Sequence, residues 1–536
     1  MRKLLTFVAA TLITGSLLAG GLVTNTNQSA MFTRLQNRNA STSIDAAYFN
    51  PAGVTKLGDG FFVSINNQTI TQTQTVISTN QFLAGQPKKY VGNVSAPIFP
   101  GVYVAYNTGR FSLSAGFNPI GGGGGAEYKT GLPSFEMMVA NIVPSLASQG
   151  IPTTAYSADI YFKGSSVYFG YQANVGYKIN DMLSVAAGVR FVSATNKYSG
   201  YLKNISINPN YSAFGPNFTG GMVLASNFFT SGATFLNGLA ASATGAASGL
   251  TAAIGGGLSA ATPLSAMPPA TVAGVTQLLG AAGISAVGMN IGTAAATLNA
   301  VAPVFTTKAN TMSANATGTQ DINVKASESG TGITPIISAN FSPSDNLNIA
   351  VRYEFKTELD LKTKVGNNLG GGIFVDGTKV VADMPAMLAI GVDYKPIDKL
   401  TLSLGFSTFF DKNTDYDGSE TVTVDEINKN FLEYGLGLEY SLTDKLRISG
   451  GWSHTDTGVN LNYQGDQRFS TNTNSVGGGF GYRITPMIDL NIGGQYAFYK
   501  DGSKDFQDIT SNTYTETYKK STWMIAVGLD FSFGKK

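Results

Sequence analysis

The sequence WMIAVGLDFSF at residues 523–533 decides the fold class of this chain. Large apolar residues occupy every second position from Trp523 to Phe533, and mostly small or polar residues stand between them. Successive side chains of a β-strand point to opposite faces, so one set can face lipid while the other faces the interior of a barrel. The segment therefore predicts a membrane-spanning strand.

The same alternation recurs upstream, most clearly at residues 347–355, 400–406 and 434–440. Short polar turns between such segments alternate with longer irregular segments, an asymmetry typical of an outer-membrane barrel. A soluble sandwich would also alternate, but with shorter strands. We therefore predict an all-β fold, a 14-stranded antiparallel transmembrane β-barrel in the bacterial outer membrane. The expected strands lie near 60–77, 97–107, 110–118, 164–179, 183–198, 320–341, 346–364, 378–394, 399–412, 428–441, 445–459, 472–484, 487–501 and 512–533.

The composition agrees with a barrel and excludes several other classes of protein. Charged residues make up 13% of the 536 residues, about half the share of an average soluble protein. The formal charge of +2 does not resemble that of a basic nucleic-acid-binding protein. Cysteine is absent, which excludes disulfides and thiolate metal sites.

The chain begins with a pattern that predicts a signal peptide over residues 1–21. Arg2 and Lys3 precede an apolar run at 4–18, and small residues follow. The alternative is a membrane anchor over 4–23, a segment just long enough to span a bilayer. An exported chain with no other long apolar segment favours strands, because only helices and closed barrels satisfy the backbone in lipid.

Two insertions in the expected barrel have helical periodicity and predict extracellular loops, at residues 119–163 and 200–319. The first begins with five glycines at 121–125, and we expect Pro144 to kink its helix. The second is rich in Ala and Gly, so the alternative interpretation is a low-complexity loop. Apolar faces on long loops often bind ligands. The candidate ligand groove consists of Phe135, Met138, Val139, Ile142, Leu146, Val275, Leu278 and Leu279.

Residues suited to catalysis are scarce. The lone His454 shares its strand parity with Trp452, so we expect it to point outward near the rim. No serine-hydrolase elbow, zinc motif or phosphate-binding glycine loop occurs. We therefore expect no enzyme, no metal and no cofactor. Charged residues at lumen positions are interpreted as interior ion pairs, with an arginine that binds a substrate carboxylate as the alternative.

The segment before the barrel carries a family resemblance. It contains STSIDAAYFNPAGV at 41–54, and DMPAM follows at 383–387. The chain resembles the FadL-type outer-membrane transporters of long-chain fatty acids and other hydrophobic compounds, whose N-terminal hatch carries an Asn-Pro-Ala motif. The resemblance implies that residues 22–58 form a hatch, or plug, inside a barrel over 59–536. Its motif would be Asn50, Pro51, Ala52 and Gly53.

The resemblance also implies a function and a route. Family members capture a hydrophobic ligand in an extracellular apolar groove, and for this chain we expect a long-chain fatty acid, with hydrocarbons as the alternative. Rearrangement of the hatch then releases the ligand through a lateral opening beside a kink in the third strand, here expected at Asn118, Pro119 and Gly121. The expected partners are hydrophobic small molecules, outer-membrane lipid and the barrel-assembly machinery, whose signal the aromatic C-terminal strand resembles. No nucleic-acid partner is expected.

Other functions stay open on the sequence alone. A general porin would also have a polar lumen, but it would not need a plug or apolar helical loops. A receptor or adhesive barrel, including one that captures haem, could use the apolar loops without transport. The third alternative is an outer-membrane enzyme, but the sequence contains no credible pair of nucleophile and base. Single-channel conductance would separate a porin from a plugged transporter.

Overall fold

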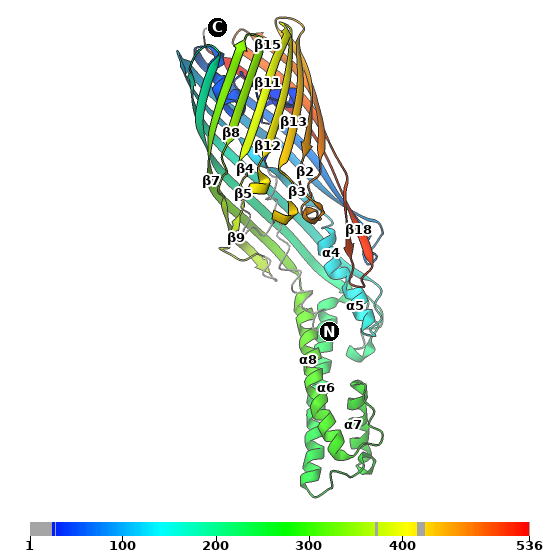
Figure 1. The fold of residues 1–536 in the computed structure, drawn as a ribbon. Coiled ribbons are helices and arrows are strands. Elements are labelled where there is room, and N and C mark those ends of the chain that lie inside the picture. The colour runs from blue at the N-terminus through cyan, green and yellow to red at the C-terminus, as the bar shows by residue number, and fades with distance from the viewer. Residues whose placement is uncertain (1–23, 27, 370–373, 415–423, 535–536) are drawn as a thin grey trace.

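The computed structural model describes residues 24–26, 28–369, 374–414 and 424–534. It is a closed antiparallel β-barrel with a long helical extension at one end (Figure 1). The first strand, β1 (Gly60–Ser78), pairs along its length with the last, β18 (Thr513–Ser532). This pairing leaves the sheet without a free edge, as a membrane barrel requires.

The strands between them follow each other around the barrel. They are β2 (Lys88–Thr108), β3 (Phe111–Tyr128), β4 (Tyr156–Lys178), β5 (Leu183–Ile207), β6 (Val223–Leu224), β7 (Ile322–Ser344), β8 (Leu347–Glu354), β9 (Asp360–Leu369), β10 (Lys379–Val381), β11 (Met387–Ile397), β12 (Leu400–Phe409), β13 (Phe431–Ser441), β14 (Leu446–Asp456), β15 (Thr473–Thr485), β16 (Ile488–Tyr499) and β17 (Gly502–Gln507). Three barrel strands are interrupted, so that β8 continues as β9, β10 as β11 and β16 as β17. With the two-residue β6 set aside, the barrel has fourteen strands, and the predicted fold class is confirmed.

The strands β2 to β5 are longer than the sequence pattern predicts. Strand β3 continues through the glycine run to Tyr128, and β4 begins at Tyr156. Only residues 133–148 of the first insertion are helical, as α4 (Pro133–Ala140) and α5 (Ile142–Ser148). The prediction of a kink at Pro144 is wrong, because the break between α4 and α5 lies at Asn141. Pro144 then falls in the first turn of α5, where its missing N–H breaks no helical hydrogen bond.

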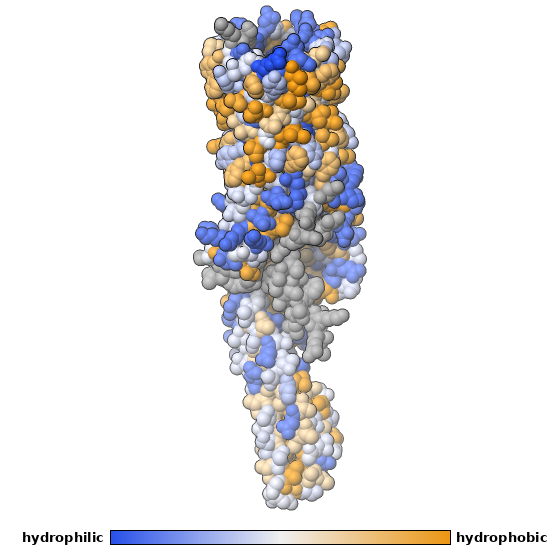
Figure 2. Space-filling view, turned by 60° about the vertical axis from the view of Figure 1, so that its left-hand side comes forward, coloured by the Kyte–Doolittle hydropathy of each residue, from blue (hydrophilic) through white to orange (hydrophobic). Residues whose placement is uncertain are grey.

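The outer surface of the barrel carries the apolar residues of the alternating pattern. Trp523, Ile525 and Val527 are about half exposed, while Met524 and Ala526 between them are buried towards the lumen. Figure 2 shows hydrophobic residues gathered on the barrel wall, away from the helical extension. The single histidine, His454, stacks on Trp452 with ring centroids 6.1 Å apart. This surface matches the hydrocarbon layer of a membrane.

The described N-terminal residues 24–26 and 28–58, which we call the plug, lie inside the barrel. They form α2 (Ala30–Leu35), α3 (Ala46–Phe49) and the 3₁₀ helix η1 (Pro51–Leu57). Helix α2 is buried throughout and packs against β15 and β16. A Cβ atom at Gly477 of β15 would lie 2.2 Å from the main-chain oxygen of Thr33, so this approach requires glycine.

The second insertion forms the helical extension seen in Figure 1. Helices α6 (Ala225–Gly255) and α8 (Ile291–Gly318) pack side by side, and α7 (Pro269–Ala281) lies against both. The interpretation as a structureless low-complexity loop is therefore wrong for most of this segment. None of the helices in the described ranges is long and apolar enough to cross a membrane. Short 3₁₀ helices complete the loops, namely η2 (Ser212–Phe214), η3 (Leu264–Ala266), η4 (Asp411–Asn413), η5 (Val424–Glu426) and η6 (Leu461–Tyr463).

Candidate functional site

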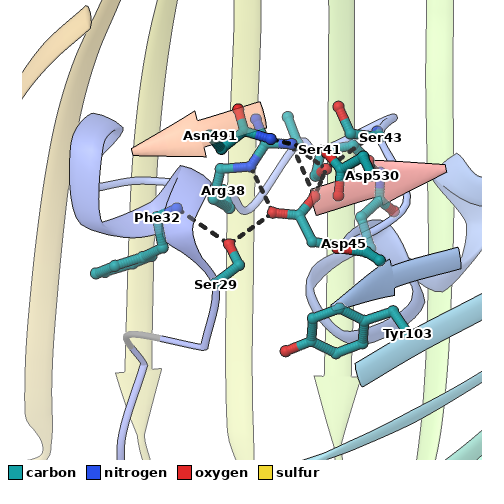
Figure 3. A network of polar contacts seen from close by, with 12 residues as sticks. Ser29, Phe32, Arg38, Ser41, Ser43, Asp45, Tyr103, Asn491 and Asp530 are labelled. Carbon is teal, nitrogen blue, oxygen red and sulfur yellow. Dashed lines mark hydrogen bonds and ion pairs between the residues drawn. The ribbon is translucent and has the colours of Figure 1, made fainter. Parts of the chain in front are cut away.

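The plug is held in one shape by a buried ion pair. Arg38 donates from Nε to Oδ2 of Asp45 at 2.9 Å and from Nη2 to Oδ1 at 2.8 Å. The hydroxyls of Ser29 and Ser41 donate to the same carboxylate at 2.8 and 2.6 Å (Figure 3). Burial alone would raise the pKa of Asp45, but the Arg38 charge and these hydrogen bonds hold that pKa below its ordinary value. The pair fixes the two ends of the loop between α2 and α3.

The motif residues Asn50, Pro51, Ala52 and Gly53 fasten the plug to the wall. The amide nitrogen of Asn50 donates to the main-chain oxygen of Ser41 at 2.9 Å and to Oδ1 of Asn340 in β7 at 2.7 Å. Pro51 begins η1, where no N–H is needed. A Cβ atom at Gly53 would lie 2.3 Å from the Asn50 side chain, so a larger residue would displace it.

Ala52 makes two further contacts with the barrel through its main chain. Its nitrogen donates to the hydroxyl of Ser338 in β7 at 2.9 Å, and its oxygen accepts from the hydroxyl of Ser184 in β5 at 2.8 Å. These hydrogen bonds do not depend on the alanine side chain, which is fully buried. A small residue is therefore needed here because the surrounding space is filled. The contact with the barrel wall is made by the main chain of Ala52.

A gap in the sheet lies beside the expected kink. Strands β2 and β3 pair from Thr108 to Val102 and again from Val94 to Gly92, and pairing is lost between these stretches. The β3 residues opposite the gap include Asn118, Pro119 and Gly121, and the β3–β4 register shifts twice there. The exposed side chain of Ile98 in β2 lies at the level of the gap. The three candidate kink residues are thus brought together at one interruption of the wall.

The first described residues of the plug occupy this gap from the inside. Thr24 forms a bridge with Gly121, and the main-chain nitrogen of Asn25 donates to the oxygen of Ile120 at 2.8 Å. The Asn25 side chain donates to the oxygen of Gly122 at 2.9 Å. Residues 24–25 therefore take up hydrogen-bonding groups that β2 leaves free. No sequence pattern predicts this contact, because a segment of two residues is too short to show periodicity.

A second contact sits just beside the gap. The side chain of Asn118 donates to Oε1 of Gln28 at 2.7 Å, and the hydroxyl of Tyr103 donates to the main-chain oxygen of Gln28 at 2.6 Å. Across the lumen, the hydroxyl of Thr26 donates to Oε2 of Glu433 in β13 at 3.0 Å. The start of the plug is thus tied to both sides of the barrel.

Helix α4 lies at the end of the barrel from which the helical extension projects (Figure 1). Its side chain Glu136 holds it there. This buried carboxylate accepts from Nζ of Lys88 at 2.6 Å and from the hydroxyls of Tyr90 and Tyr156 at 2.8 and 2.7 Å. Asp466 accepts from the main-chain nitrogen of Ser134 at 2.7 Å, and burial raises the pKa of its carboxyl. Sequence reasoning missed Glu136, since a single acidic residue on an apolar helix resembles an ordinary surface residue.

The structure divides the candidate groove residues between two places. Phe135, Met138, Val139, Ile142 and Leu146 lie on α4 and α5 near the barrel mouth. By contrast, Val275, Leu278 and Leu279 lie on α7 at the far end of the extension and are buried in its core (Figure 1). One extended apolar cluster contains or borders both sets, but the residues do not line a single groove. The α7 residues stabilise the helical bundle.

Comparisons with known proteins agree with this architecture. The family model of outer-membrane protein transport proteins (OMPP1/FadL/TodX) matches residues 284–533. A Pseudomonas aeruginosa FadL homologue has a TM-score of 0.56 at 12% identity, over 96% of this chain and 100% of its own. The P. putida toluene transporter TodX has a TM-score of 0.51 at 12% identity, over 92% of this chain and 95% of its own. These solved structures share the fold. No curated protein matches the sequence significantly.

Proposed function

We propose that the chain, whose residues 284–533 match the family model of the OMPP1/FadL/TodX outer-membrane transport proteins, carries hydrophobic compounds across the outer membrane by the following route. Capture occurs on the apolar faces of α4 and α5, and the compound then enters the lumen. It leaves sideways into the membrane through the gap between β2 and β3. Long-chain fatty acids and aromatic hydrocarbons are the proposed cargo.

The observation that carries this proposal is the contact between the start of the plug and the gap. Where residues 95–101 of β2 do not pair with β3, backbone groups on the facing edges of both strands lack a strand partner, which is costly in lipid. Thr24 and Asn25 satisfy some of these groups in the closed state. Moving them inward would open a passage at the level of the apolar surface. A plug that both fills the lumen and seals the side of the barrel fits a gated lateral exit.

Physical chemistry favours a sideways route for an apolar cargo. Transfer of each CH₂ group of the cargo out of water is favourable by about 0.8 kcal/mol. A long-chain compound that crossed the polar lumen and entered water again would lose this favourable transfer free energy. Release into the bilayer retains it. Plugging the lumen also prevents leakage through a barrel of fourteen strands, which is wide enough to conduct.

A reversible crosslink tests the exit directly, because the chain has no cysteine of its own. Thr24→Cys with Gly121→Cys joins two bridge partners and should hold the plug against the gap. Ser503→Cys with Thr517→Cys joins cross-strand partners of β17 and β18 and serves as the control. Uptake of radiolabelled hexadecanoate and of toluene is measured separately in proteoliposomes.

We expect the oxidised 24–121 crosslink to reduce uptake to background, and a reductant to restore it. The control crosslink should leave uptake unchanged. Full uptake with a completed 24–121 crosslink would contradict the lateral route. Comparing the two cargoes shows which class the protein prefers.

A further inference from the structure

At the level of the gap, strand β2 pairs with β1 but not with β3. The β1–β2 register shifts at this level, because Gln68 lies opposite Phe99 while Ile70 lies opposite Ala96. Strand β2 therefore has two residues, Pro97 and Ile98, where β1 has one. Such a β-bulge bends its strand and interrupts the ladder locally.

The bulge reverses which residues of β2 face the lumen. On one side of it Tyr103 is buried, and its hydroxyl donates to the main-chain oxygen of Gln28 in the plug. On the other side Tyr90 is buried, and its hydroxyl donates to Glu136 of α4. Because side chains alternate along a strand, an odd-numbered and an even-numbered residue can both face inward only if an extra residue lies between them. The position of the bulge therefore determines the contacts of β2 with the plug and with α4.

Two polar side chains of β1 fasten the bulge. Asn67 donates from Nδ2 to the main-chain oxygen of Pro97 at 3.2 Å, and its Oδ1 accepts from the main-chain nitrogen of Phe99 at 3.1 Å. The hydroxyl of Thr69 donates to the same Pro97 oxygen at 3.0 Å. We call Asn67 and Thr69 the clasp. The Asn67 amide both donates and accepts, so it takes the place of a peptide group in the β1–β2 ladder.

Both residues of the clasp stand at lipid-facing positions. Their partners in β18, Val527 and Ile525, are about half exposed, whereas Asn66 and Gln68 beside them are buried towards the lumen. A polar side chain at a lipid-facing position of a barrel is costly. Here the cost is offset, because the clasp satisfies main-chain groups of the bulge that would otherwise be unpaired in lipid. Pro97 itself has no N–H to give to the ladder.

We propose that Asn67 and Thr69 are positioning residues for the lateral exit: they hold the bulge of β2 against β1 and so keep residues 95–101 from pairing with β3. Without the clasp, the main-chain groups of Pro97 and Phe99 need new partners, and the facing edge of β3 has groups without a strand partner. Pairing across the gap would then narrow the exit. This inference rests on the proposed function, because it explains how the same exit is kept open to cargo.

Two fatty acids of different width test the clasp: hexadecanoate and hexadecanoate that carries a terminal pyrene. Their uptake by the full chain in proteoliposomes is measured over a range of concentrations. Asn67→Leu preserves the approximate shape and removes two hydrogen bonds, so the maximal rate for the pyrene probe should fall roughly tenfold. Thr69→Val removes one bond and should lower this rate roughly threefold. The rate for hexadecanoate should fall less, and the half-saturating concentrations should not change.

Two control variants separate the clasp from a general effect on the barrel. Thr69→Ser keeps the hydroxyl and should transport both probes as the wild type does. Thr71→Val removes a hydroxyl from the next lipid-facing position, where β1 and β2 pair in regular register, and should also have no effect. A merely structural role of the clasp would lower the unfolding temperature and slow both probes by the same factor.

An unchanged ratio of the two rates in Asn67→Leu and Thr69→Val would overturn the clasp while leaving the lateral route intact. Faster uptake of the pyrene probe would overturn it too, because the clasp would then narrow the exit. If Asn67→Leu does not assemble, the comparison of Thr69→Val with Thr69→Ser decides the question. If the wild type takes up neither probe, the proposed function and the clasp both fall.

Discussion

The aromatic ring of Tyr48 in the plug lies 4.9 Å from the guanidinium of Arg190 in the barrel wall. The guanidinium of Arg352 lies 5.0 Å from the same ring. Glu354 accepts from both Nη atoms of Arg190, at 2.6 and 2.7 Å, and lies 3.3 Å from Arg352. One carboxylate cannot balance two cations, so the electron-rich ring and the main-chain oxygen of Tyr48, which accepts from Arg352, supply the rest. The plug therefore completes a buried charge cluster that belongs to the wall.

Tyr48→Leu should loosen the plug, because it removes the ring from two guanidiniums while preserving an apolar side chain. The expected loss is about 1–3 kcal/mol for opening of the plug. Tyr48→Phe keeps the ring and should behave nearly as the wild type. Hydrogen exchange of the amides at residues 44–54 measures the opening. Equal acceleration in both variants would show that the ring does not anchor the plug.

Glu136→Gln should release helix α4 from the barrel mouth. The substitution removes the ion pair with Lys88 and the charge-assisted bonds from two tyrosines, which we expect to cost about 1.5–3 kcal/mol. Glu127→Gln is the control, because its ion pair with Lys163 spans 4.0 Å between partly exposed side chains. Limited proteolysis within 133–148 should be faster in the first variant alone. Equal cleavage of both proteins would mean that Glu136 does not hold the helix.

Ile142→Asp should weaken capture of a hydrophobic ligand. This side chain is half-buried on α5 near the mouth, and a carboxylate there would meet an apolar ligand at a high desolvation cost. Leu279→Ala makes a contrasting variant, since Leu279 is fully buried in the helical extension. It should destabilise the extension by about 2–5 kcal/mol and leave binding at the mouth unchanged. Ligand dialysis and thermal unfolding separate the two effects. If only Leu279→Ala weakens binding, capture takes place at the extension instead.

The barrel could be predicted from sequence because two different solvents act on each strand. In β18, the apolar residues Ile525 and Val527 face lipid, and small residues such as Ala526 face the lumen. A run of glycines has no side chains that could alternate in this way, so the pattern is lost there. The glycine run that ends with Gly125 shows no alternation, so the sequence pattern predicts an end of β3 near Asn118, whereas its backbone pairs with β4 as far as Tyr128.

The site could be predicted only in part. The Asn50 motif was recognised from its local pattern, but its partner Asn340 is 290 residues away in the chain. The contact of Asn25 with Ile120 is also a long-range pairing that no local pattern specifies. On α7, helical spacing correctly indicated an apolar face, yet such spacing cannot distinguish a ligand groove from the core of a helical bundle.

Single-channel conductance of the intact protein, compared with a variant that lacks residues 24–58, tests the central claim most directly. The plug fills the lumen and pairs with the wall from Thr24 at the gap to Asn50 at β7. We therefore expect little steady conductance from the intact protein and a large, constant pore from the deletion variant, together with sensitivity to bulky hydrophilic antibiotics. An intact protein that conducts as well as the deletion variant would contradict the account and identify a general porin.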